Sequence, residues 1–187
     1  MSLFNLFHRD PHEAPARALY AALVAQARQP HFYARWGVPD TLDGRFDLIA
    51  LHAFLLLHRL QQEHPHSKGL AQALLDTIFT DMDSNLREMG VGDLGVGRRV
   101  KRMAQGLYGR IAAYDEALSG PPEALEAALR RNLYGTVAVP DPACVEAMAG
   151  YVRAQAAHLK TQDYATLATG TVNFDGPAPA VEDRAGA

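Results

Sequence analysis

The sequence contains one cysteine, Cys144, among its 187 residues. A single thiol forms no internal disulfide and cannot supply the several cysteine ligands of a structural zinc site. This scarcity of cysteine indicates a reducing compartment. Apolar residues nevertheless make up 48% of the chain, which is enough for a sizeable core. At this length the chain is expected to form one domain.

The sequence also lacks a long apolar run. No stretch reaches the roughly 18–20 apolar residues that a membrane-spanning helix needs. The longest candidate, LIALHAFLLLHRL, is interrupted by His52 and ends at His58 and Arg59, so it predicts a buried helix. The first ten residues, MSLFNLFHRD, have too short an apolar run for a secretory signal. Their bulky side chains indicate either a flexible end or a weak interfacial anchor.

There is no surplus of basic charge. Eighteen Lys and Arg residues face twenty-one Asp and Glu residues, giving a net charge of −3. A protein directed wholly at nucleic acid is normally more basic. We therefore expect no DNA partner, and we expect any anion binding to be local.

The familiar catalytic and metal motifs are missing as well. The sequence contains no G-x-S-x-G, no G-x-x-x-x-G-K-[ST], no H-E-x-x-H and no pair of Glu-x-x-His motifs. The triplet DMDSN has the spacing that opens a calcium loop, but Leu86 stands where that loop needs Gly and Gly92 where it needs Glu. We predict no catalytic residues, no metal site, no cofactor and no enzyme.

What is present is helical periodicity. Apolar stripes and Pro or Gly breaks predict an all-α, single helical-bundle domain of about six helices over residues 13–169. A flexible N-terminus, 1–12, precedes it, and a Gly-, Pro- and Ala-rich tail, 170–187, is expected to be disordered. The expected helices cover residues 13–28, 46–63, 67–89, 93–118, 122–134 and 142–167, with an aromatic connector at 31–38.

The helix expected at 67–89 decides how DMDSN is interpreted. Its apolar stripe includes Met82 and Leu86, which places Asp81 and Asp83 on a helical surface. Asp83 and Arg87 are four residues apart, the favourable spacing for an ion pair. Two interpretations remain open for these acids: a recognition surface, or an internal salt-bridge set against the basic residues 98–102.

Those basic residues form a stripe within the next helix. Arg98, Arg99, Lys101 and Arg102 lie opposite the apolar positions, and Arg110 extends the cationic side. The stripe is either ordinary solvated surface or a site for phosphate groups of RNA, for anionic lipid or for an acidic partner.

His52 lies among apolar residues in the middle of its helix. A histidine there is typical of a hydrogen-bonded core or interface residue. The alternative is a haem- or small-molecule-binding helical protein built around His52 and the aromatic residues 31–36, since one His suffices to ligate haem.

Three stretches together resemble the ubiquinol–cytochrome c chaperone family. They are LHAFLLLHRL at 51–60, LLDTIFTDMDSNLREMGVGD at 74–93 and LYGRIAAYDEAL at 107–118. The resemblance covers residues 18–167, and the short front resembles a stand-alone bacterial form. It implies an assembly chaperone that binds newly made cytochrome b, or a related membrane respiratory subunit, and assists ubiquinol–cytochrome c reductase biogenesis by binding.

The resemblance also implies partners and a location. Mitochondrial members act near the ribosomal exit with a small partner, so a small helical partner protein and the ribosome are expected. The charge of the basic helix separately predicts contact with the ribosome or with an anionic membrane surface. The expected location is the cytoplasm, including the periphery of the inner membrane. The family supplies no catalytic role for the residues that match its motifs here, which are Asp76, Asp81, Asp83, Arg87, Glu88, Asp93, Tyr108, Gly109, Arg110, Tyr114 and Asp115.

Together these arguments predict a set of client- or partner-binding residues. The set comprises His52, Asp81, Asp83, Arg87, Arg98, Arg99, Lys101, Arg102, Tyr108, Arg110 and Tyr114.

Overall fold

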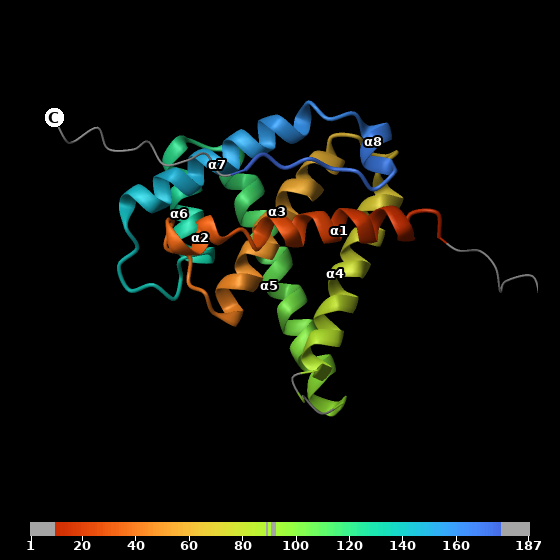
Figure 1. Ribbon diagram of the computed structural model, residues 1–187, viewed down its shortest axis with the longest axis horizontal. Helices are drawn as coiled ribbons and strands as arrows, with labels where there is room; N and C mark the ends of the chain where they lie inside the picture. The colour runs from red at the N-terminus through yellow and green to blue at the C-terminus, as the bar shows by residue number, and fades with distance from the viewer. Residues whose placement is uncertain (1–9, 89, 91–92, 177–187) are drawn as a thin grey trace, which may run out of the picture.

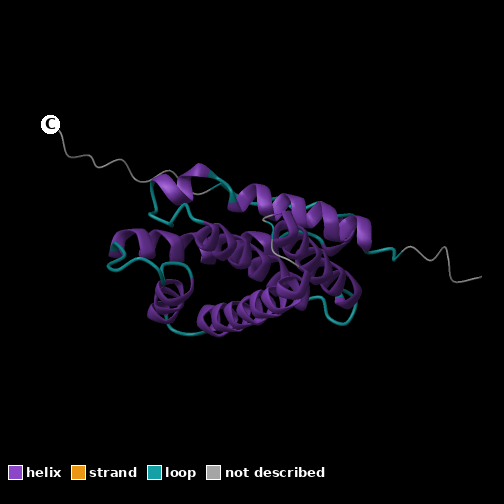
Figure 2. Cartoon of the chain, turned by 90° about the horizontal axis from the view of Figure 1, so that it is seen from below, coloured by secondary structure: helices purple, strands orange, loops and turns teal. Residues whose placement is uncertain are grey.

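The computed structural model describes residues 10–88, 90 and 93–176. These residues form helices and loops and contain no strand (Figure 2). The helices are α1 (Glu13–Ala27), α2 (Pro30–Ala34), α3 (Leu42–Gln61), α4 (Lys68–Glu88), α5 (Asp93–Ser119), α6 (Pro122–Asn132), α7 (Pro142–Lys160) and α8 (Tyr164–Ala168). Six of them have eleven or more residues, and α2 and α8 have five each. The predicted all-α class is confirmed.

Helix α3 lies at the centre of the domain. It packs against α1, α4, α5 and α7 (Figure 1). Its middle is apolar nearly all round, so covering helices must surround it. Leu51, Phe54, Leu55 and Leu56 are fully buried there. The two main core clusters meet along this helix, one toward α6 and α7 and the other toward α1 and α4.

The start of α3 is fixed by a cap and by a close backbone approach. The Thr41 side chain accepts a hydrogen bond from the Gly44 backbone N–H at 3.1 Å, which satisfies one free donor of the first turn. The helix therefore begins at Leu42, four residues before the predicted Phe46. A Cβ on Gly44 would overlap the Pro39 carbonyl oxygen, so only Gly fits against the preceding loop.

Helices α4 and α5 form a long hairpin whose far end extends beyond the rest of the domain (Figure 1). The predicted stripe of α4 is buried, including Leu74, Ile78, Met82 and Leu86. The helix ends at Glu88, and Gly90 has a φ of 77°, a left-handed conformation that favours glycine. The predicted stop at Gly90 is confirmed.

A polar network crosses the core at His52. This side chain is fully buried, and its Nδ1 lies 2.8 Å from the Leu48 carbonyl oxygen. A carbonyl only accepts, so Nδ1 carries the proton and Nε2 accepts from the Tyr151 hydroxyl, also at 2.8 Å. Gln26 donates to the same hydroxyl at 2.9 Å. Burial lowers the pKa of His52 to about 4, and its hydrogen bond to Leu48 opposes the shift only in part.

The C-terminal part differs from the prediction in two ways. The last predicted helix, 142–167, is broken at residues 161–163 into α7 and α8. Residues 170–176, predicted to be disordered, pack along α7 instead. Gln155 donates to the Asp175 carbonyl at 2.9 Å, Gln162 donates to the Asn173 carbonyl at 2.6 Å, and Phe174 packs edge-on against the His52 ring.

The composition of residues 170–176 does not predict this packing, because the side chains that hydrogen-bond to their backbone carbonyls are glutamines elsewhere in the sequence. The rest of the predicted tail, 177–187, lies outside the described residues, as do residues 1–9 of the predicted flexible N-terminus. Among the described helices, none combines the length and apolar character needed to cross a membrane.

Because buried His52 is neutral, stability should depend on pH. The unfolded chain binds this proton near pH 6.5, but the folded chain binds it only near pH 4. The stability contributed by the neutral histidine is therefore lost as pH falls from 6.5 to 4, by at most about 1.4 kcal/mol per pH unit. Denaturant unfolding across this range should give a shallower pH slope for His52→Gln than for the wild type.

Asp47 has a second shifted pKa in this range, but it is common to both proteins and cancels in the comparison. Identical slopes in the two proteins would show that His52 is not held neutral in the core.

A pair of glycine substitutions tests the start of α3. Gly44→Ala should destabilise the protein by about 1–3 kcal/mol, because the new methyl group has no room against Pro39. Gly97→Ala on exposed α5 meets nothing within 4 Å and should stabilise it by up to about 1 kcal/mol. Thermal unfolding measures both; a neutral Gly44→Ala would contradict the close approach.

Candidate functional site

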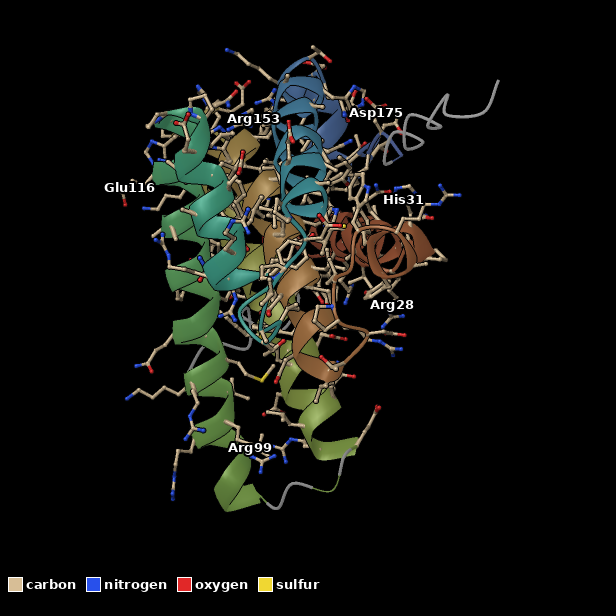
Figure 3. The ribbon with its side chains drawn as sticks, turned by 90° about the vertical axis from the view of Figure 1, so that its left-hand side faces the viewer. Arg28, His31, Arg99, Glu116, Arg153 and Asp175 are labelled. Carbon is tan, nitrogen blue, oxygen red and sulfur yellow. The ribbon has the colours of Figure 1, made fainter. Side chains whose placement is uncertain are left out.

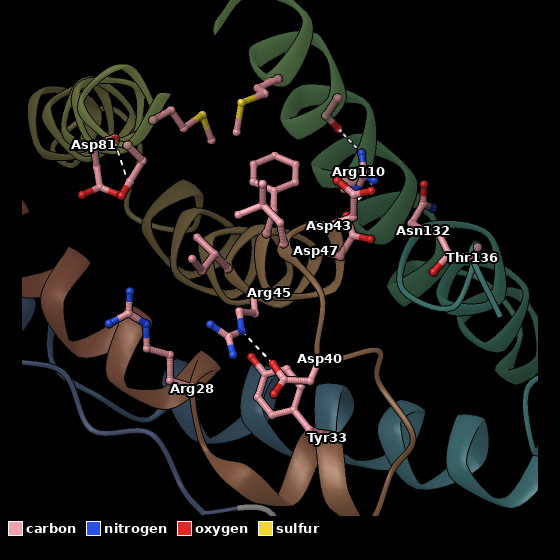
Figure 4. A pocket seen from close by; sticks show the side chains of 18 of the residues that line it. Arg28, Tyr33, Asp40, Asp43, Arg45, Asp47, Asp81, Arg110, Asn132 and Thr136 are labelled. Carbon is pink, nitrogen blue, oxygen red and sulfur yellow. Dashed lines mark hydrogen bonds and ion pairs between the residues drawn. The ribbon is translucent and has the colours of Figure 1, made fainter. Parts of the chain in front are cut away.

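A groove of about 1570 Å³ is hollowed into the described structure. It lies over the first half of α3. Helices α1 and α2 border it on one side, the last turns of α4 and the middle of α5 on the other, and the end of α6 closes it (Figure 4). Because these segments are far apart in the sequence, the groove exists only in the folded chain.

Much of the groove lining is apolar. Phe46 and Ile49 come from α3, Met82 and Leu86 from α4, and Met103 from α5. At the rim, the Leu42 side chain in the first turn of α3 is 65% exposed. Methionine is flexible and polarizable, which suits a surface that adapts to differently shaped apolar groups.

Charged and phenolic side chains form the rim toward α1 and α2. Arg45 Nε donates to Asp40 Oδ1 at 2.6 Å, next to Tyr33 (Figure 4). The Tyr20 hydroxyl donates to Asp81 Oδ2 at 2.6 Å. Burial and this hydrogen bond raise the pKa of Tyr20. The phenol therefore remains a neutral donor that holds α1 against α4.

Three further cations of the rim are available to an occupant. Arg28, Arg102 and Arg131 line the groove, and within the described part of the chain they make no ion pair. Arg28 directly follows α1, and the other two belong to α5 and α6, so positive charge surrounds the apolar lining from three sides.

The deepest polar pair is Asp47 and Arg110. Arg110 Nη2 lies 2.6 Å from Asp47 Oδ1, and the guanidinium carbon sits 5.5 Å from the centre of the Phe46 ring. Asp47 is only 7% exposed. Burial raises the pKa of Asp47 to about 6, although the charge of Arg110 opposes the shift.

This pair is incompletely hydrogen-bonded. Among the described residues, Asp47 Oδ1 and Arg110 Nε have no partner that meets hydrogen-bond geometry, even though the ion-pair contact is short. Buried polar atoms are normally satisfied. Both atoms are shielded from solvent, so an occupant of the groove would reach them only if neighbouring side chains moved.

The structure separates the sequence-predicted residues into groups. Asp81, Arg102 and Arg110 line the groove. Arg98, Arg99 and Lys101 are exposed on α5 and are not part of the lining. On α4, Asp83 and Arg87 form the predicted ion pair, with Arg87 Nε 2.6 Å from Asp83 Oδ2.

The remaining predicted residues lie away from the groove. Tyr108 is 49% exposed and its ring lies 5.8 Å from that of Phe79, away from the groove lining. His52 and Tyr114 are fully buried, so neither side chain is at the surface of this conformation, and their role as partner contacts stays a prediction. This burial agrees with the sequence pattern, in which Tyr114 belongs to the apolar stripe of its helix and His52 lies among apolar residues.

The sequence left open whether the acids of α4 form ion pairs with the basic residues 98–102. The structure answers this question for Asp81 and Asp83. Asp81 pairs with Tyr20 and with Asn85 Nδ2 at 2.7 Å, and Asp83 pairs with Arg87. In the described part of the chain, neither joins the basic residues 98–102. The internal salt-bridge set against those residues is therefore not formed by these two acids.

Sequence reasoning missed the α1, α2 and early α3 side of the groove. Tyr20, Arg28, Arg45, Phe46 and Asp47 belong to no chemical motif. The aromatic connector was the only nearby signal, and it contributes Tyr33. Only the packing of three separate segments brings these residues together.

Two other chemistries find little support. Within the described residues, no group of three or more His, Cys, Asp or Glu side chains could hold a metal ion. Haem iron would need a ring nitrogen of His52, but both nitrogens are hydrogen-bonded and no part of the side chain is exposed.

Comparisons with known proteins agree on one family. A model of the ubiquinol–cytochrome C chaperone family matches residues 34–174. The ubiquinol–cytochrome c reductase complex assembly factor 1 of Xenopus laevis is 28% identical over 148 residues, covering 79% of this chain and 74% of its own length. The human protein of that name is 28% identical over 160 residues, covering 85% of this chain but only 53% of its own length.

A solved structure shares both sequence and fold. The crystal structure of the Cbp3 homolog from Brucella abortus is 40% identical, with a TM-score of 0.77, and the match covers 88% of this chain and 91% of that one. This agreement confirms the resemblance predicted from the three motifs. The all-α domain with its groove over α3 belongs to the ubiquinol–cytochrome c chaperone family.

Proposed function

We propose that this chain is an assembly factor for ubiquinol–cytochrome c reductase. It binds newly made cytochrome b, or a related membrane respiratory subunit, in the groove over α3, and it acts by binding rather than by catalysis. Family membership and the names of the relatives support the assembly role. The groove supports the mode of action.

The groove is the observation that carries this proposal. Its volume of about 1570 Å³ exceeds the roughly 300–1,000 Å³ typical of small-molecule sites. A helix is about 10–12 Å across with its side chains, and an apolar lining inside a charged rim is the arrangement that receives an amphipathic helix. A segment of a membrane subunit that has not yet reached its final place would bury its apolar side chains there.

The polar groups would orient such a segment. An apolar helix entering the groove meets Phe46, Met82 and Met103 along its length. Its occasional polar side chain can pair with Arg28, Arg102 or Arg131, which line the groove and make no ion pair among the described residues. Apolar contact would thus provide affinity, and the charged rim would fix the position of the segment.

Other parts of the surface are assigned to other partners. Tyr108, which packs on Phe79, is the proposed contact for a small helical partner protein. The Asp83–Arg87 pair on α4 belongs to the same proposed set of partner contacts. The proposed location is the cytoplasm and the periphery of the inner membrane.

Deleting the gene tests the assembly role. The deletion should lower the amount of spectroscopically detectable cytochrome b in membranes, and the wild-type gene should restore it. In-cell crosslinking followed by purification of the chain should recover cytochrome b. Unchanged cytochrome b in the deletion strain would contradict the assembly role.

A matched pair of substitutions tests the groove. Leu42→Glu places a charge at the groove rim, whereas Val139→Glu places the same charge at an 85% exposed position that is not part of the groove lining. Both should leave stability within about 0.5 kcal/mol, and a Glu in the first turn of α3 also suits the helix dipole. Only Leu42→Glu should reduce the yield of the cytochrome b crosslink, severalfold. Equal yields from the two variants would exclude the groove as the client site.

A further inference from the structure

The outer end of the α4–α5 hairpin carries a concentrated positive charge in a chain of net charge −3. We define the basic stripe as Arg98, Arg99, Lys101 and Arg102. All four side chains are exposed. Between residues 94 and 114 the sequence contains no Asp or Glu, so nothing on this part of α5 offsets the charge.

The basic stripe is also free of ion pairs within the described part of the chain. Some other exposed arginines of the domain are paired, as Arg17 is with Glu13 and Arg45 with Asp40. Among the described residues Arg28 and Arg131 are unpaired as the stripe is, but they are single residues on separate segments, whereas the stripe places four cations within five residues. The basic stripe therefore contributes no ion pair that stabilises the fold, and its charges face solvent.

The position of the basic stripe is as informative as its charge. The hairpin extends beyond the other helices (Figure 1), and Arg99 lies near its outer end, opposite the end that carries Arg153 and Asp175 (Figure 3). A projecting end can touch a flat surface while the acidic body stays away from it.

We propose that the basic stripe docks the protein on an anionic lipid bilayer. A polybasic surface is attracted to the phosphates of an anionic leaflet, and each Lys or Arg near that surface strengthens binding roughly fivefold. The four residues together should strengthen binding on the order of 100-fold or more at low salt.

The shape of this region favours lipid over a strand of RNA. Single-stranded nucleic acid is typically held in a positively charged groove that follows its backbone. Here the four cations are on the surface of a projecting helix, and three of them, Arg98, Arg99 and Lys101, are not part of a groove lining.

Docking would also orient the client groove. Arg102 belongs both to the basic stripe and to the groove lining. A bilayer in contact with the stripe would therefore lie beside one end of the groove, where a segment leaving or entering the membrane could reach it. The docking itself does not depend on the proposed client, so it can be tested with lipid alone.

The test uses the full-length chain and sedimentation with vesicles. The wild type should bind vesicles of phosphatidylcholine mixed with phosphatidylglycerol at low salt, bind vesicles of phosphatidylcholine alone poorly, and dissociate at high salt. The stripe variant, Arg98→Gln, Arg99→Gln, Lys101→Gln and Arg102→Gln together, should bind anionic vesicles on the order of 100-fold less tightly.

A matched control removes the same amount of charge elsewhere. Arg17, Arg35, Lys68 and Lys160 are exposed on other parts of the domain, and their combined substitution by Gln gives the same net charge as the stripe variant. This control should bind vesicles nearly as well as the wild type. Circular dichroism of both variants should match the wild type, because exposed positions are changed.

Three outcomes would overturn the proposal. One is a wild type that does not sediment with anionic vesicles at low salt. Another is equal loss of binding in the stripe variant and the matched control, which would mean that net charge alone acts. The third is stripe-dependent sedimentation with ribosomes but not with vesicles, which would assign the stripe to RNA. None of these outcomes bears on cytochrome b levels, so failure here is distinguishable from failure of the assembly role.

Discussion

The structure depends on the burial of α3. A helix that is apolar on almost every side cannot face water, and α1, α4, α5 and α7 pack around it for that reason. The covering is incomplete at the first turns, where Leu42 and Phe46 are only partly covered. The groove is thus the part of the central helix that the chain leaves for something else to cover.

Polar groups inside the core tie distant segments to that helix. His52 links the Leu48 carbonyl to Tyr151 of α7, and Arg59 donates to the carbonyl oxygens of Leu159 and Gln162 at 3.0 and 2.8 Å. Each of these bonds satisfies a buried group, and leaving one unmade would be costly. They tie α7 and the segment after it to α3.

The charged side chains include two contrasting groups: those that form ion pairs within the fold, and those of the basic stripe, which face solvent. Ion pairs such as Asp83–Arg87 and Asp47–Arg110 lie within α4 or join α3 to α5. The basic stripe at the end of the hairpin has no such partner among the described residues. Arg102 belongs to both the basic stripe and the groove lining. A surface that binds the stripe would therefore also fix the orientation of the groove relative to that surface.

The sequence by itself determined the helical class, most helix positions, the Gly90 stop and the family, because these follow from local periodicity, turn residues and motif order. It misjudged residues 170–176, since the glutamines that bind their backbone, Gln26, Gln155 and Gln162, lie elsewhere in the chain. It also placed His52 and Tyr114 among the contact residues, although their burial depends on which helices cover them. The groove itself could be located only in the tertiary structure. Tyr20, Asp47 and Arg110 line it from three different helices, and no local sequence pattern connects those helices.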